Sequence, residues 1–335
     1  MTTQQDCSLG FVKEPTYGTA VTVSRWLEYA SDPEFNYVPN RVQGSGQRAG
    51  QRVDRTNRRV TTTSEAGGSV EVEMLSKGLG TFLELCLGAG ASTLVSGATY
   101  QQLFTLSDTP PSATFQVGIV RDATTIAADT YLGCVCESFE FTGEQGGILK
   151  LKATLDARAV DTAIAYASPS YPTASATNLY HFANAAIYSG ALTAPTSTAL
   201  AAGATELANV RSWSVAVARN LGKSTVFGDQ GKKRKVYPGK PGITGKLEVE
   251  YVDATFRDAF LADTPMSLVV TYEAGALSSG KETIQVVIPE IKFDGEMPKP
   301  NGAELVVSTM AFTGLDNATA AQPIWVVMRT SDAAL

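Results

Sequence analysis

The chain has 335 residues, of which 44% are hydrophobic and 18% are charged, and its formal net charge is −6. This length allows two domains or one large β domain, and the many Thr, Val, Ala, Gly and Ser residues favour strands and turns over a charged helical bundle. No apolar run approaches the roughly 20 residues of a membrane helix, and the opening MTTQQDCSLG does not resemble a signal peptide. We therefore expect a protein that is made in the cytosol and has no membrane partner.

The predicted elements of the first half are strands, one long loop and one helix. Residues 35–42 alternate as a strand, and a loop rich in Gly and Arg follows, the first basic loop (residues 43–59). The next strand changes to helical spacing over residues 75–86, and Gly88 ends the helix. Two strands joined by GEQGG, within residues 136–155, complete the half.

The second half repeats this order about 177 residues later. A strand at residues 213–221 precedes the second basic loop (residues 222–239), and a further strand leads into a helix at residues 256–261. A strand, turn and strand within residues 284–312 close the half. Such internal similarity indicates a duplicated unit.

The repeat predicts two domains and a matching pattern on their strands. We place the units at residues 1–158 and 178–335, with an exposed linker rich in Ala, Ser, Thr and Pro at residues 159–177. In each unit the strand after the basic loop has apolar residues on one face and two glutamates on the other. These glutamates are Glu71, Glu73, Glu248 and Glu250.

The two basic loops are exceptions in an acidic chain. Residues 41–60 contain six Arg and one Asp, and residues 223–240 contain five Lys, one Arg and one Asp. Such clusters can neutralise phosphate, but few aromatic residues accompany them, so a loop that docks on an acidic protein surface is favoured over a DNA-binding or merely solvated loop. The candidate docking residues are Arg48, Arg52, Arg55, Arg58, Arg59, Lys232, Lys233, Arg234 and Lys235.

The residues that enzymes need are mostly absent. His181 is the single histidine, which excludes metal sites built on two histidines. The glycine spacing of QGSGQRAG is not that of a dinucleotide-binding loop, and the paired glutamates are typical of the solvated face of a sheet. Cysteines 7, 86, 134 and 136 contain no CxxC pair, and we expect them to be free thiols. We predict no enzyme, cofactor or metal site.

Several stretches together resemble a known family. SLGFVKEPTYGTAV, RWLEYASDPEFNYVPNRVQ and SVEVEMLSKGLGTFLELCLG in the first half, and HFANAAIYSG, NVRSWSVAVARNL and GKLEVEYVDATFRDAF in the second, are similar to major tail tube proteins of long-tailed, non-contractile bacteriophages, especially those of actinobacteria. The resemblance covers nearly the whole chain. It implies a mainly β protein of two tandem β-sandwich or barrel units, each with a short flanking helix and a long basic loop.

The same resemblance implies a structural role in the virion tail. Units of this family join edge to edge in rings that stack into a tube, and the tube holds the tape measure protein and later conducts double-stranded DNA. Further expected partners are the tail tip or distal tail proteins and the tail terminator, with assembly in the host bacterial cytoplasm. Family members with one unit form hexameric rings, so two units favour a trimeric, pseudo-sixfold ring over a hexamer of this chain.

Two expectations for residue roles follow from this resemblance. The four glutamates line the lumen, or, if their strands face outward, serve as docking partners for the basic loops. The basic residues reach from one ring to the next, and their loops become ordered on assembly. The alternative function is a soluble two-domain β binding module whose basic loops recognise nucleic acid or an acidic protein.

Overall fold

A computed structural model describes residues 6–122, 125–171, 177–294, 297, 299 and 305–335, and it is mainly β with two α-helices. The first half contains strands β1 (Ser8–Lys13), β2 (Arg25–Leu27), β3 (Tyr29–Gln43), β4 (Arg59–Glu73), β5 (Gly88–Ser96), β6 (Thr99–Leu106), β7 (Ala113–Val120), β8 (Ile126–Gly143), β9 (Lys150–Ala157) and β10 (Ala159–Asp161), with helix α1 (Gly80–Leu87). The second contains β11 (Ala185–Ser189), β12 (Thr205–Glu206), β13 (Val210–Ala218), β14 (Gly242–Glu250), β15 (Met266–Ala276), β16 (Lys281–Phe293), β17 (Val307–Gly314) and β18 (Trp325–Thr330), with helix α2 (Thr255–Leu261).

The two halves share one pattern of strand pairing. Seven antiparallel pairs of the first half recur in the second when β1, β2, β3, β4, β7, β8, β9 and β10 are matched with β11 to β18 in order. For example, β4 lies between β3 and β9, and β14 lies between β13 and β17. The helix follows the same strand in both halves. The structure thus has the fold class expected of two tandem units.

A direct strand pairing joins the two units. β8 of the first unit pairs with β13 of the second, from Trp213 opposite Gly143 to Ala218 opposite Ser138. We call this pairing the internal seam. It makes one continuous sheet in the order β3, β4, β9, β8, β13, β14, β17 and β16, which we call the inner sheet. Its strands alternate between buried apolar and solvated residues, as half-buried strands do.

A second layer covers the apolar face of the inner sheet. In the first unit β2, β1 and β7 continue from β8, and in the second β12, β11 and β15 continue from β16. One hydrophobic core runs through both units, because residues such as Phe141, Trp213 and Val326 belong to the same buried cluster. The units therefore do not fold around separate cores.

The units differ where the first contains an extra hairpin. β5 and β6 follow α1, and β6 crosses to pair with β18 of the second unit, whereas α2 leads directly to β15. The helix α1 begins at Gly80, later than the predicted residue 75, because Gly78 turns the chain with a φ of 80°. The first residues of the predicted linker form β10, which pairs with β8.

Candidate assembly surfaces

The solvated face of the inner sheet carries all four predicted glutamates. Glu71 and Glu73 lie on β4 and Glu248 and Glu250 on β14, half-buried, between residues such as Val70 that point into the core. The sequence pattern thus placed both pairs correctly on the face opposite the core. These positions alternate with apolar ones, so each pair shares one side of its strand.

Basic residues on neighbouring strands compensate three of these glutamates. Lys150 and Lys152 of β9 lie opposite Glu73 and Glu71 in the strand register, and Lys150 Nζ lies 3.1 Å from Glu71 Oε1. In the second unit Arg211 Nε lies 3.7 Å from Glu250. The face is therefore a mixture of charges. The sequence contained the signal, since Lys150 and Lys152 alternate on a strand, but it did not show that β9 lies beside β4.

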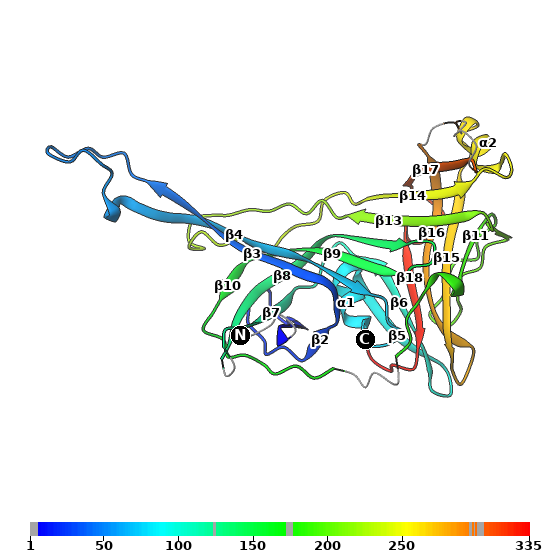
Figure 1. The fold of residues 1–335 in the computed structure, drawn as a ribbon, viewed down its shortest axis with the longest axis horizontal. Helices are drawn as coiled ribbons and strands as arrows, with labels where there is room; N and C mark the ends of the chain where they lie inside the picture. Colours follow the sequence, from blue (N-terminus) through cyan, green and yellow to red (C-terminus); the bar gives the residue numbers. More distant parts are fainter. Residues whose placement is uncertain (1–5, 123–124, 172–176, 295–296, 298, 300–304) are drawn as a thin grey trace.

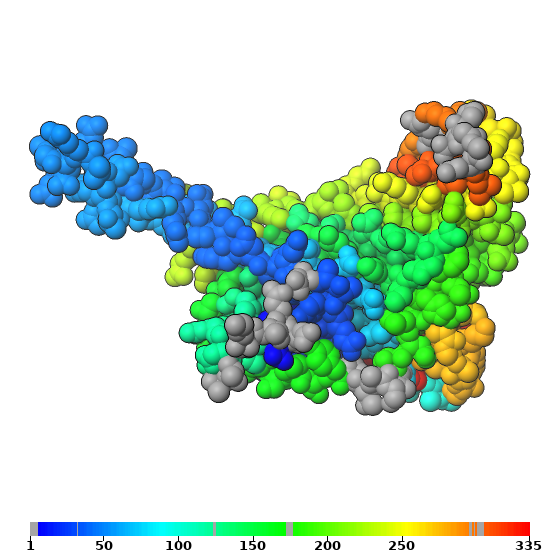
Figure 2. All heavy atoms as spheres, viewed as in Figure 1, coloured from blue at the N-terminus to red at the C-terminus, as the bar shows by residue number. Residues whose placement is uncertain are grey.

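The first basic loop forms the tip of a long two-stranded arm. β3 and β4 remain paired as far as Gln43 opposite Arg59, and the ribbon projects well beyond the rest of the chain (Figures 1 and 2). Arg55 is half-buried, and its carbonyl accepts a hydrogen bond from Gln43 Nε2 (3.3 Å). The other predicted residues of this loop are exposed: Arg48, Arg52, Arg58 and Arg59.

The second basic loop lies against the first unit. Lys233 is only 7% exposed, and its Nζ lies 2.6 Å from Asp156 Oδ1 at the end of β9. Lys223 bonds the same oxygen and Glu137 Oε2, both at 3.0 Å. Burial alone would lower the pKa of Lys223, but its bonds to the two carboxylates outweigh this effect and raise it.

The remaining basic residues of this loop have different environments. Lys232 and Lys235 are exposed, and Arg234 Nε pairs with Asp229 in the same loop at 2.9 Å. Lys233 is the exception to the predicted docking role, because Asp156 lies beneath it and a charge this deeply buried requires a partner. The sequence did not reveal that pair, which joins positions 77 residues apart.

The histidine and the cysteines, the other candidates for chemistry, lie in environments typical of residues that stabilise the fold. His181 is half-buried, with Nε2 3.0 Å from Nδ2 of Asn184. All four cysteines are free, and burial raises the pKa of the Cys86 thiol well above its usual value. Among the described residues no group of three or more His, Cys, Asp or Glu side chains could hold a metal ion. None of the described helices is long and apolar enough to span a membrane.

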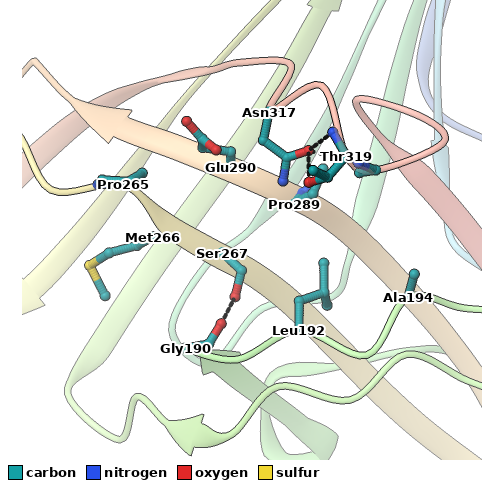
Figure 3. Close-up of a pocket in the computed structure, with 11 residues that line it drawn as sticks. Gly190, Leu192, Ala194, Pro265, Met266, Ser267, Pro289, Glu290, Asn317 and Thr319 are labelled. Atoms are coloured by element: carbon teal, nitrogen blue, oxygen red, sulfur yellow. Dashed lines mark hydrogen bonds between the residues drawn. The ribbon is translucent and has the colours of Figure 1, made fainter.

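A cavity of about 420 Å³ opens on the second unit near the ends of β11, β15 and β16 (Figure 3). Ser267 Oγ donates to the carbonyl of Gly190 (2.8 Å), and Asn317 Oδ1 accepts from Thr319. Glu290 is the one ionisable side chain among the lining residues. This lining provides no nucleophile with an adjacent base. The full lining is Gly190, Leu192, Ala194, Pro265, Met266, Ser267, Pro289, Glu290, Asn317, Thr319 and Ala320.

Comparison with known families gives one match that spans most of the chain. A family model described as phage tail tube protein matches residues 4–314. No curated protein matches the sequence. The matched region includes the arm, the second basic loop and every strand except β18.

Proposed function

Because the chain belongs to the phage tail tube protein family, and is therefore a structural subunit of a virion tail, we propose that three copies form a closed ring and that rings stack into the tube. The proposal rests on one observation, the internal seam. β8 ends the inner sheet of the first unit and β13 begins that of the second, and the chain pairs them directly. The same pairing between chains would extend the sheet around a lumen.

The strands that would make this second seam are β3 and β16. β3 occupies in the first unit the place of β13 in the second, yet within the described part of the chain it pairs with β4 alone. It is 15 residues long, and so long an open edge is a template for pairing with another chain. β16 matches β8, and the seam residues of β8 match positions just past the end of β16. In one copy the segment that continues β16, part of which lies outside the described residues, would therefore pair with β3 of the next.

Backbone direction at the open edge supports this pairing. In the internal seam the N–H of Arg219 points toward β8 and donates to the carbonyl of Glu137 (2.9 Å). Tyr37 is two residues before the matching position on β3, and its N–H donates to Oδ1 of Asn36 (2.8 Å). Strand residues two apart point the same way, so the Tyr37 N–H faces the open side. Pro39, at the position of Arg219, has no N–H and would end the seam there.

A ring of this kind can be closed by three chains. A head-to-tail interface gives a ring only if its rotations add up to a full turn. Each chain contributes two similar units and one seam already made, so three chains supply six units and six similar junctions. We therefore favour a pseudo-sixfold trimer over a ring of six whole chains.

The polar face of the inner sheet would line the lumen. Its Glu and Lys residues are solvated and largely offset each other in charge, so the wall would neither bind nor strongly repel a polyanion. Such a wall suits a tube that holds the tape measure protein and later lets duplex DNA slide through without sequence-specific contacts. Tail tip proteins and the tail terminator would contact the two ends of the tube, and assembly would take place in the host cytoplasm.

The tip of the arm would contact the next ring. Arg48 and Arg52 are exposed there, beyond the reach of the subunit's own body (Figure 1). Exposed ion pairs contribute only about 0 to 1 kcal/mol each, so stacking depends on many copies acting together. Tube length measured at increasing salt should fall, because salt screens these charges. Tubes of unchanged length across that range would contradict the contact.

Electron microscopy of end-on rings tests the proposal directly. Three-fold rings with six similar lobes are the expected result. Rings of six complete chains would retain the tube function and refute the trimer. The absence of rings at high protein concentration and in virions would refute the assembly altogether.

The exposed arm also supports a second candidate function, a binding module for nucleic acid. Its arginines could neutralise phosphates, which would make binding steeply dependent on salt. A titration with duplex DNA at physiological salt distinguishes the two functions, since a subunit whose arm serves assembly should bind only weakly.

A further inference from the structure

The second basic loop covers a defined surface of the first unit. Leu221, directly before the loop, and Val236 within it pack on Val135 of β8 and against Tyr17, and Tyr17 Oη donates to the carbonyl of Arg234 (3.2 Å). Beside this apolar contact lies the buried pair of Lys233 and Asp156. Apolar packing and a buried ion pair thus hold one unit's loop on the unit before it.

The strand repeat locates the matching surface on the second unit. Asp156 lies opposite Gly67 of β4 and Val135 of β8. The matching residue of β17 is Thr313, which lies opposite Thr244 of β14 and Lys292 of β16. Its Oγ1 donates to Oδ2 of Asp294 (2.7 Å). A carboxylate therefore occupies nearly the same place in both units.

Among the described residues, no loop covers this matching surface as the second basic loop covers that of the first unit. Asp294 is exposed, and Leu315 is 37% exposed. The cavity of Figure 3, lined by Glu290 and Met266, lies next to Leu315, whose N–H donates to the carbonyl of Glu290 (2.9 Å). Lys292 is already paired with Asp263 (2.6 Å). The exposed surface is therefore apolar in part and negatively charged at Glu290 and Asp294. We call it the acceptor surface.

We propose that the acceptor surface binds the root of the arm of a second copy in the same ring; this inference rests on the ring of the proposed function. By the root we mean the paired residues 37–43 and 59–65 of β3 and β4. The arm connects β3 to β4 as the second basic loop connects β13 to β14. When β3 of one copy pairs with β16 of another, its root is brought over the acceptor surface.

The root has the composition that this surface requires. Val42 and Val60 are 47% and 56% exposed, which is costly for side chains that remain in water. Arg41 and Arg59 beside them are exposed and would meet Glu290 and Asp294. The tip continues past the distance that the second basic loop reaches (Figure 1), so root and tip can contact different neighbours.

Charge reversal with rescue tests this contact. The variant Glu290→Lys with Asp294→Lys should lower the yield of rings about tenfold, as should Arg41→Glu with Arg59→Glu, because like charges would face each other. Combining the four changes should restore most of the yield. The matched control is Asp253→Lys with Asp258→Lys, which changes the charge equally near α2 and should leave the yield unaltered. Reversals without effect, or without mutual rescue, would overturn the proposal.

Carbodiimide labelling of the unmodified protein separates this inference from the function on which it rests. Asp294 should react in the monomer and be protected in single rings kept apart by charge reversal at the tip, Arg48→Glu with Arg52→Glu, at ordinary salt. Protection that appears only in stacked tubes would overturn the same-ring assignment. Full reactivity in three-fold rings would overturn the inference while the ring itself stands. A protein that forms no rings would refute both.

Discussion

The two basic loops occupy the same place in the repeated unit and have the same net charge, but their structures differ completely. The second is held on the body by the buried contact of Lys233 with Asp156, whereas the first lies at the tip of an arm that extends past the body (Figure 2). The chain supplies a carboxylate and an apolar patch beneath one loop only. The comparison shows that a loop's position depends on the surface beneath it, and in the proposed ring the partner of the arm's tip comes from another copy.

The largest expected effect comes from a change at the open edge of β3, where the arm begins. Tyr37→Pro removes an N–H that points away from β4, and so should spare the arm while blocking the second seam. Each ring would lose hydrogen bonds worth about 0.5 to 1.5 kcal/mol at three seams, and the ring yield should fall by at least about tenfold. Analytical ultracentrifugation measures it.

The matched control for this change is Tyr37→Thr, which keeps the N–H and favours a strand. It should assemble like the unmodified chain. Normal rings from Tyr37→Pro, in a protein whose monomer unfolds at an unchanged temperature, would show that β3 is not the pairing edge.

Asp156→Ala should convert the second basic loop into a free loop like the first. Removing one partner of a buried ion pair costs about 3 to 5 kcal/mol, because Lys233 must remain buried alone or leave with its loop. Urea unfolding of the monomer, prepared with Tyr37→Pro to prevent assembly, measures the cost. Hydrogen exchange over residues 222–239 should rise together with the loss of stability.

The arm supplies the contrast for that experiment. Arg52→Ala removes an exposed charge and leaves no buried charge without a partner. Its effect on the free energy of unfolding should therefore stay within about 0.5 kcal/mol. If Asp156→Ala proved equally harmless and left exchange unchanged, the buried pair would not be what holds the loop.

Gly143→Ala should destabilise the internal seam, so that its stability becomes closer to that of the proposed seam between chains. Gly143 lies opposite Trp213, whose Nε1 donates to Tyr272 Oη (2.8 Å), and a Cβ at Gly143 would overlap both partners. Overpacking of this kind costs about 1 to 3 kcal/mol, measurable by urea unfolding. The control is Gly242→Ala, where a Cβ meets nothing within 4 Å, and equal losses for the two changes would refute this reading.

Sequence reasoning recovered what depends on local order. The alternation around Glu71 and Glu248 placed both strands with the correct face to the core, and the repeat predicted the order of strand, basic loop, strand and helix that both halves share. What it missed depends on register between distant strands. Examples are Lys150 beside Glu71, the pairing of β6 with β18, and Asp156 beneath Lys233. A charge run such as KKRK reads the same whether its loop is buried or free, so only the tertiary structure distinguishes the two loops.

The smallest expected effect on stability comes from changes on the polar face of the inner sheet, where both units carry a pair of glutamates. Reversing Glu71, Glu73, Glu248 and Glu250 to Lys breaks two partly exposed ion pairs worth about 0 to 1 kcal/mol each, so rings should still form. The lumen would become strongly basic, and DNA ejection from reconstituted virions should slow, because fixed cations bind phosphate. Exchanging Glu71→Lys with Lys150→Glu leaves the net charge unchanged and should leave ejection normal. If the fourfold reversal ejected DNA at the normal rate, these strands would not face the lumen, and the glutamates would instead be candidates for docking the arm.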